Sequence, residues 1–402
     1  MVRGVLMLAL FGASFAAYPN MSLFKLPQTN GAACLDGTPP AYWLVQGTET
    51  TKYYINFEGG GWCTSLDDCA SRAGSRKGSS NNLPDPFNLV QLMGAWGTWY
   101  FGNTTDVNPL MHNWTMIQVL YCDGASWAGS NSSATVHKNK TLHFKGKNNL
   151  DALMADLLTK QAMDQATEVV ISGGSAGALA VYLHADAIRK VLPKSAKVVA
   201  MPDDGFFMDN DQSRAHGWVS KQRWTYEAQN GSAGVPAECL GRYRKDEQWN
   251  CFMAQAVAPG IRTPLFALQP MYDAYQIGAE LGTSDPAAVN AYGANLTATL
   301  KATVLANPQN GAYLDGCEHH GGGWPAMFAQ AADKSWASPI KAFSQWYAGV
   351  GDPAAATTRR YWQMPSTGML PNGRLASDFP CQACCPCKPN RTSSNFNQGC
   401  SK

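Results

Sequence analysis

The 402-residue sequence predicts an α/β fold with a mostly parallel central sheet flanked by helices. Short β-branched runs alternate along the chain with apolar stretches of helical period, and this alternation is typical of parallel sheets. Residues 71–110 are rich in Gly, Ser, Asn and Pro and are predicted to form long loops. The predicted strands lie within 41–57 (two strands joined by a polar turn) and at 115–120, 167–171, 196–201 and 264–268, and the predicted helices cover 149–166, 176–192 and 298–305.

The N-terminus has the layout of a secretory signal peptide. Arg3 precedes an apolar run over 4–12, and small residues at 13–17 place the expected cleavage after Ala16. The run is too short to cross about 30 Å of hydrocarbon as a helix, and no other apolar stretch is long enough. Residues 1–16 are therefore predicted to be a signal peptide, which leaves a secreted protein, extracellular or in the cell wall, without stable membrane insertion.

Cysteines and sequons agree with an oxidising extracellular compartment. The chain has 12 cysteines and eight Asn-x-Ser/Thr sequons, four of which lie between Asn103 and Asn139. No repeat or linker interrupts the chain before residue 351, so one domain is predicted over 17–376. Residues 377–402 hold five of the cysteines and are predicted to form a disulfide-linked tail, because no histidine is near to complete a zinc site. The formal net charge of +2 gives no reason to expect a nucleic-acid partner, and a monomer is expected.

The stretch Gly-Gly-Ser-Ala-Gly at 173–177 connects a predicted strand to a predicted helix. In that position the Gly-x-Ser-x-Gly pattern is typical of the nucleophile elbow of α/β-hydrolases, where a sharp turn holds a serine between small residues. The N–H groups that open the following helix favour negative charge beside the serine. Ser175 is the predicted nucleophile, and the alternative is a glycine-rich connection with a solvated serine.

A nucleophilic serine needs a base, and in this fold the chain order is nucleophile, acid, base. Of seven histidines only His319 and His320 fit that order, and the residues alone do not choose between them. A metal site at this pair is less favoured, because adjacent histidines point in different directions. Catalytic groups gather at the carboxyl ends of parallel strands, and there Asp273 is the preferred acid. The competing aspartates are Asp203, Asp204 and Asp209.

A glycine triplet after an early predicted strand supplies a candidate oxyanion hole. The sequence there is Glu-Gly-Gly-Gly-Trp at 58–62, similar to the glycine motif of esterases. The backbone N–H groups of Gly61 and Trp62, with that of Ala176, are expected to bind the oxyanion. The alternative is a flexible turn without a catalytic role.

Taken together, six motifs resemble those of the pectin acetylesterase family, which are secreted plant and microbial carbohydrate esterases. The Wnt-deacylating enzyme Notum belongs to the same superfamily. The motifs are EGGGWC (58–63) with Cys69, YCDGASWAG (121–129), ISGGSAGALA (171–180), DDGFFMD (203–209), PMYDAYQI (270–277) and the Cys317-x-x-His320 spacing.

The resemblance implies an α/β-hydrolase-like esterase domain with the triad Ser175, Asp273 and His320, and with neither metal nor cofactor. It favours His320 over His319, because the family's histidine stands three residues after a cysteine. The resemblance also implies that the backbone N–H groups of Gly61, Trp62 and Ala176 donate hydrogen bonds to the oxyanion.

The chain departs from the family at two glycines. Typical plant members carry cysteines where this chain has Gly174 and Gly321. Disulfide pairing therefore cannot be transferred, and the family pattern does not explain the cysteines of the tail.

The sequence thus predicts a serine carboxylesterase that removes O-acetyl groups from a cell-wall or extracellular polysaccharide through an acyl-enzyme. The alternatives are a Notum-like lipid deacylase acting on an acylated protein and a non-catalytic glycan-binding relative. Several tryptophans would suit stacking on sugar rings, although core packing explains them equally well. They are Trp62, Trp96, Trp99 and Trp127.

Overall fold

The computed structural model describes residues 20–88, 99–321, 329–331, 333–352, 360–369 and 375–380. The predicted signal peptide, Trp96, the side chain of Trp99 and the five cysteines of the tail lie outside the described residues. No helix in the described ranges is both long and apolar enough to cross a membrane.

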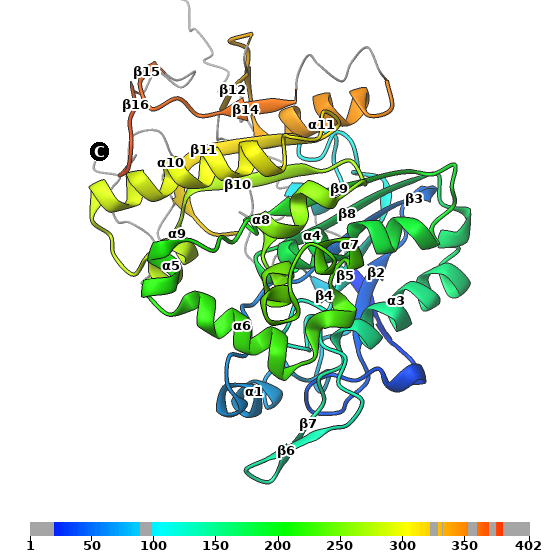
Figure 1. The fold of residues 1–402 in the computed structure, drawn as a ribbon. Coiled ribbons are helices and arrows are strands. Elements are labelled where there is room, and N and C mark those ends of the chain that lie inside the picture. The colour runs from blue at the N-terminus through cyan, green and yellow to red at the C-terminus, as the bar shows by residue number, and fades with distance from the viewer. Residues whose placement is uncertain are drawn as a thin grey trace, which may run out of the picture.

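A twelve-stranded sheet runs through the centre of the described structure (Figure 1). Its middle strands, in the order β5, β3, β8, β9, β10, β11 and β14, are all parallel to their neighbours, whereas the strands toward both edges pair antiparallel. The prediction of a mostly parallel sheet is therefore confirmed. The strands are β1 (Asn20–Lys25), β2 (Ala41–Val45), β3 (Glu49–Phe57), β4 (Phe87–Asn88), β5 (Trp114–Val119), β8 (Glu168–Gly174), β9 (Lys197–Asp203), β10 (Phe266–Asp273), β11 (Gly311–His319), β12 (Ala329–Ala331), β13 (Trp336–Ala337) and β14 (Tyr361–Gln363).

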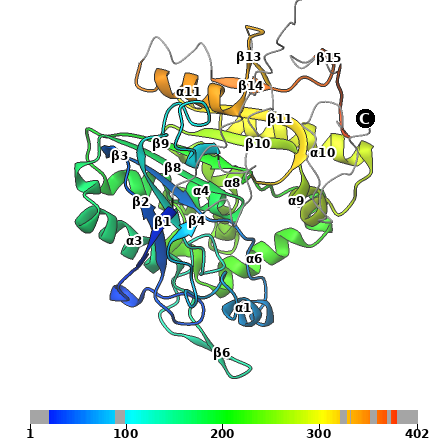
Figure 2. The ribbon, with the colours of Figure 1, turned by 180° about the vertical axis from the view of Figure 1, so that it is seen from behind.

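Helices cover both faces of the sheet, as the two views of the ribbon show (Figures 1 and 2). Along β8, Val169 and Ile171 join the core formed with α3, α4 and α10, whereas Val170 joins the core formed with α11. Alternate residues of one strand thus bury on opposite faces, as the pleat requires. The helices are α1 (Leu66–Ala73), α3 (Gly146–Lys160), α4 (Ala176–Val191), α5 (Asp211–Ala215), α6 (Trp218–Ala228), α7 (Ala237–Leu240), α8 (Ala254–Val257), α9 (Ala274–Gln276), α10 (Pro286–Thr303) and α11 (Pro339–Gly349), and two small hairpins pair β6 (Thr135–His137) with β7 (Lys140–Leu142) and β15 (Gly368–Met369) with β16 (Leu375–Ala376).

All the predicted strands and helices are present, but several boundaries differ. The strands β8 and β10 continue to Gly174 and Asp273, so each reaches the site that was predicted to follow it. The strand β11 was not predicted, and it runs as a buried strand through Gly311–His319. Several other elements were not predicted, among them β1, α1, α6, α11, β14 and the first half of α10. The two strands of 41–57 are not neighbours, since β5 lies between β2 and β3.

Three disulfides link described cysteines, which confirms the prediction of disulfide bonds. They join Cys34 to Cys122, Cys63 to Cys69 and Cys239 to Cys251. Cys317 is also disulfide-bonded.

Glycine is required where the nucleophile turn packs against β3. A Cβ on Gly177 would lie 2.0 Å from the Phe57 carbonyl oxygen, a distance that no real side chain tolerates. The start of α4 therefore rests directly on the backbone at the end of β3.

We expect Gly177→Ala to lower the stability of the fold, because the added methyl group collides with backbone that the sheet holds in place. Overpacking of this kind costs about 1–3 kcal/mol or more. Urea unfolding followed by circular dichroism would measure the change. Gly278→Ala is the matched control, since nothing lies within 4 Å of its Cβ position; equal stability of the two variants would contradict the prediction.

A buried acid lies behind the carboxyl end of β10. The Glu280 carboxyl is fully buried, and it accepts hydrogen bonds from Gln276 Nε2 at 3.2 Å and from the Tyr292 hydroxyl at 2.5 Å. Burial raises the pKa of Glu280 from its ordinary value of 4.5 to about 8. The folded protein therefore holds a proton on Glu280 at neutral pH.

The folded state binds this proton more tightly than the unfolded state does. The contribution of the Glu280 proton to the free energy of unfolding is therefore complete below the ordinary pKa of 4.5 and is lost as the pH rises toward 8. We expect Glu280→Gln, which mimics the protonated acid, to flatten the fall in Tm between about pH 5 and 8. Thermal unfolding at a series of pH values would measure this, with Glu227→Gln on the exposed side of α6 as control. An unchanged slope in Glu280→Gln would refute the assignment.

Candidate active site

The predicted nucleophile occupies a strained turn between β8 and α4. Ser175 has φ 57° and ψ −123°, a backbone conformation that L residues rarely adopt. Its N–H donates to the Asp203 carbonyl at 2.9 Å, so neighbouring β9 holds the turn. The half-buried serine side chain thus stands at the carboxyl edge of the sheet.

The glycine loop after β3 lies against this turn. A Cβ on Gly59 would come within 2.5 Å of the Gly174 carbonyl oxygen and 2.9 Å of the Ser175 Cβ. Gly60 and Gly61 have φ values of 146° and 66°, which glycine adopts without strain. The sequence therefore needs glycines both for the close approach and for the turn that follows.

Ser175, His320 and Asp273 form one hydrogen-bonded chain. His320 Nε2 lies 2.8 Å from Ser175 Oγ, and His320 Nδ1 lies 2.8 Å from Asp273 Oδ2. The imidazole is 22% exposed and the aspartate side chain is fully buried. The structure thus brings together the three residues that the sequence nominated, with the histidine in the middle.

The surroundings of Asp273 fix its orientation. Its Oδ1 accepts hydrogen bonds from the backbone N–H groups of Tyr275 at 2.8 Å and Gln276 at 3.0 Å, as the N-cap of α9. The Tyr275 ring stacks on the His320 ring, with centroids 5.2 Å apart. Tyr275 was not among the predicted site residues, although it lies in the same motif as Asp273.

The neighbouring histidine has a different environment. His319 is the last residue of β11, is 1% exposed, and its Nε2 lies 3.2 Å from Asp315 Oδ1. Burial alone would lower the pKa of His319, but the Asp315 carboxylate and the other nearby acids outweigh burial and raise it. His319 is therefore a buried partner of the nearby acids, and His320 is the histidine that reaches Ser175.

The competing aspartates also have other partners. Asp203 lies 3.4 Å from the Tyr100 hydroxyl, and Asp209 forms a two-point contact with Arg214 at 2.5 Å. Asp204 is fully buried and accepts a hydrogen bond from the Gly321 N–H, next to His320. Burial raises the pKa of Asp203 to about 6, and burial together with the Asp203 charge raises the pKa of Asp204.

The side chain of Trp62, one of the three oxyanion candidates, is held by two successive hydrogen bonds. Trp62 Nε1 donates to Ser126 Oγ at 2.8 Å, and that hydroxyl donates to the Ala176 carbonyl at 2.7 Å. The indole is 6% exposed and packs edge-on against the Phe207 ring at 4.9 Å. Trp62 therefore serves packing, as does the 2%-exposed Trp127, and neither offers an open face to a sugar.

Backbone N–H groups of the glycine loop and of the start of α4 have no hydrogen-bond partner in the part of the chain that the structure describes. No hydrogen bond among the described residues uses the N–H of Gly61 or Trp62. Ala176 is the first residue of α4, where an N–H has no partner within the helix. These three groups can therefore donate to a bound oxyanion.

Within the described ranges, one group of acids and histidine has ligand atoms close enough for a metal ion. It comprises Asp204, Asp273 and His320, with these atoms within 4.8 Å of one another. Hydrogen bonds to Gly321, Tyr275 and Ser175 already use the same side chains. The arrangement is thus that of an acid–base relay to a serine.

Comparison with known proteins gives a consistent result. The model of the pectinacetylesterase family matches residues 14–353. The chain is 34% identical to Pectin acetylesterase 7 of Arabidopsis thaliana over 276 residues, which cover 68% of this chain and 67% of that protein. It is 33% identical to Pectin acetylesterase 11 of the same plant over 280 residues, 69% of this chain and 68% of that protein.

An animal relative is more distant. Palmitoleoyl-protein carboxylesterase NOTUM of Mus musculus is 27% identical over 254 residues, which cover 61% of this chain and about half (48%) of that enzyme. The resemblance drawn from the six motifs is confirmed by these matches, and the observed sheet is consistent with the fold that it implied. The chain therefore belongs to the pectinacetylesterase family of carboxylic ester hydrolases.

Proposed function

We propose that this chain is a secreted serine carboxylesterase that removes O-acetyl groups from a cell-wall or extracellular polysaccharide. The observation that carries the proposal is the relay from buried Asp273 through His320 to Ser175, with both links at 2.8 Å. A serine in hydrogen-bond reach of an oriented base is the arrangement that acyl transfer requires.

In the first half of the reaction, Ser175 Oγ forms a bond to the ester carbonyl carbon while His320 Nε2 takes the hydroxyl proton. Asp273 holds the imidazole and stabilises its positive charge. The carbonyl oxygen becomes an oxyanion, to which the N–H groups of Gly61, Trp62 and Ala176 donate. The bond to the sugar oxygen then breaks, and His320 gives its proton to that oxygen.

In the second half, a water molecule gives its proton to His320 and attacks the acetyl-serine carbonyl. The same donors stabilise the second oxyanion. The bond to Ser175 Oγ breaks, the serine recovers its proton from His320, and acetate leaves. No step uses a metal or a cofactor.

The relatives support acetyl as the acyl group and pectin as the first polysaccharide to test. The two plant relatives at 34% and 33% identity are named pectin acetylesterases, and the matches cover 67% and 68% of their lengths, whereas the match to the enzyme named for palmitoleoyl-protein covers 48% of its length. A Notum-like deacylase and a glycan-binding relative without activity remain as outcomes of the experiment below.

Secretion is part of the proposal. It is supported by the signal-like N-terminus, by the three disulfides and by exposed sequons such as Asn103 and Asn139. Asn139 lies in the turn between β6 and β7, on a hairpin that projects from the body of the protein (Figure 1).

We expect the secreted protein to hydrolyse p-nitrophenyl acetate faster than p-nitrophenyl octanoate and to release acetic acid from acetylated pectin. Ser175→Ala should abolish both activities, whereas Ser220→Ala, an exposed serine on α6, should retain them. Preference for octanoate would instead favour the lipid deacylase, and inactivity of folded protein would favour the binding relative.

Asp273→Asn should lower kcat about 10⁴-fold, because the amide favours the wrong imidazole tautomer. Asp209→Asn should lower kcat little, since Asp209 contacts Arg214 and not the histidine. Steady-state kinetics on p-nitrophenyl acetate would measure both, and a larger loss in Asp209→Asn would reverse the assignment of the acid.

A further inference from the structure

Cationic side chains bind all three carbonyl groups of the glycine loop. Lys77 Nζ donates to the Gly59 carbonyl at 2.5 Å. Arg72 Nη1 donates to the Gly60 carbonyl at 2.9 Å, and Arg72 Nη2 donates to the Gly61 carbonyl at 3.4 Å. One guanidinium thus spans two consecutive peptide groups. The Gly61 carbonyl also accepts a hydrogen bond from the Tyr121 hydroxyl at 2.7 Å.

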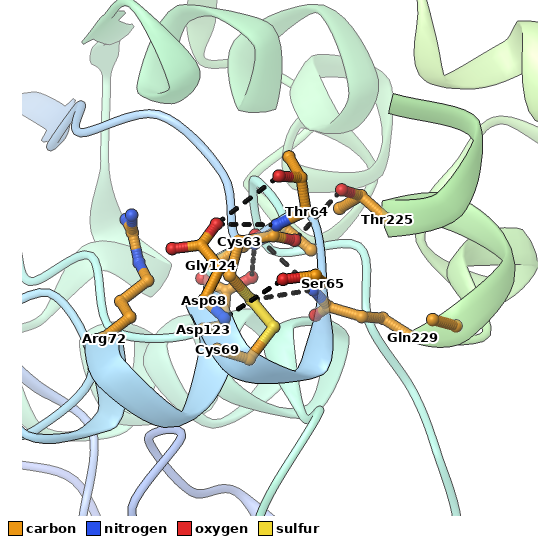
Figure 3. Close-up of a disulfide and its surroundings, with 12 residues drawn as sticks. Cys63, Thr64, Ser65, Asp68, Cys69, Arg72, Asp123, Gly124, Thr225 and Gln229 are labelled. Carbon is orange, nitrogen blue, oxygen red and sulfur yellow. Dashed lines mark hydrogen bonds between the residues drawn. A yellow bond between two sulfur atoms is a disulfide. The ribbon is translucent and has the colours of Figure 1, made fainter. Parts of the chain in front are cut away.

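A disulfide and α1 hold Arg72 in place beside the loop (Figure 3). The Cys63–Cys69 bond ties the end of the loop to α1, which carries Arg72 in its last turn. The Cys63 N–H donates to the Gly124 carbonyl at 3.1 Å, so a second segment anchors the same point. Arg72 Nε also donates to the Lys77 carbonyl at 3.0 Å, which links the two cationic residues.

The buried acid Glu58 precedes the three glycines and forms ion pairs with cationic side chains on the same side of the loop. The Glu58 side chain is 6% exposed and pairs with Arg76 at 2.6 Å and with Lys77 at 3.3 Å. Burial lowers the pKa of Lys77. With three cations against one carboxylate, the side of the loop away from its N–H groups is electropositive.

The geometry of the peptide group connects these contacts to the oxyanion hole. In a planar trans peptide, the C=O of one residue and the N–H of the next point in opposite directions. The carbonyls of Gly60 and Gly61 share their peptide groups with the N–H groups of Gly61 and Trp62. A side chain that binds these carbonyls therefore directs these N–H groups to the opposite side, and its charge polarises them.

We propose that Arg72 is a positioning residue of the oxyanion hole, which aims the N–H groups of Gly61 and Trp62 by binding the carbonyls behind them, with Lys77 supporting the preceding peptide. This inference rests on the proposed function, because it needs an oxyanion to form. It adds two side chains that lie behind the backbone donors.

The test uses Arg72→Lys and Lys77→Met in the full secreted protein. Lysine keeps the charge of Arg72 but is shorter and lacks the planar guanidinium fork, and methionine keeps the length of Lys77 without the donor. The matched controls are Arg189→Lys, which also loses a two-carbonyl contact (Pro193 at 3.0 Å and Lys194 at 2.9 Å), and Lys140→Met, which loses a contact to the Ala70 carbonyl at 2.7 Å.

We expect kcat on p-nitrophenyl acetate to fall about tenfold or more in both loop variants while KM stays within about twofold, because only the transition state carries the oxyanion. Affinity for a trifluoromethyl ketone, which forms a tetrahedral adduct with the serine, should fall by the same factor. The two controls should match the wild type in all three quantities.

Two results would overturn the inference while leaving the proposed function intact. One is wild-type kcat in both loop variants, and the other is a loss that appears in KM and leaves ketone affinity unchanged. Should Arg72→Lys fail to fold, Lys77→Met still tests whether support of the peptide that precedes the two donors matters for kcat. If Ser175→Ala were as active as the wild type, the proposed function and this inference would fall together.

Discussion

The strained backbone of Ser175 is the constraint on which the site depends. A positive φ at a serine persists only where its surroundings leave no alternative, and here β9 binds its N–H while glycines on both sides admit neighbouring backbone. The same turn ends β8 and begins α4, so the serine, the first N–H of the helix and the glycine loop meet at one place. The close approach of Gly59 and Gly177 means that the site and the sheet are packed as one unit.

A second feature of the site is that several ionisable side chains are buried next to it. Asp203, Asp204, Asp315 and His319 are each at most 2% exposed. Asp203 ends β9 and Asp204 follows it, whereas Asp315 and His319 lie in β11, on the other side of β10. So many carboxyls cannot all be charged in a low dielectric with a single imidazolium among them. Raised pKa values at Asp203 and Asp204 are the consequence, and the Asp204 carboxyl accepts the Gly321 N–H beside His320.

Much of this architecture was predictable from the sequence, since alternation of strands and helices indicated the parallel sheet. The elbow and the chain order of acid and base nominated Ser175 and Asp273, while His320 needed the family resemblance. The strand β11 (Gly311–His319) was not predicted, because its sequence contains glycines and charged residues that are uncommon in buried strands. The contacts of Arg72 and Tyr275 could not be predicted. Arg72 binds a carbonyl 12 residues earlier in the chain, and Tyr275 stacks on His320 from another strand end. Neither contact produces a periodic pattern in the sequence.

The register between β10 and β11 determines whether Asp273 and His320 can meet. Their parallel register sets Asp273 opposite His319, so that His320 is the first residue beyond the pair. A slip of one residue would exchange the faces on which the side chains lie and would separate His320 from Asp273. The partners are 47 and 145 residues apart in the chain, so neither contact can form locally during folding. The hydrogen bonds among Ser175, His320 and Asp273 therefore report on strand register. They form only when the distant strands pair in the native register, and a collapsed chain without that register lacks them.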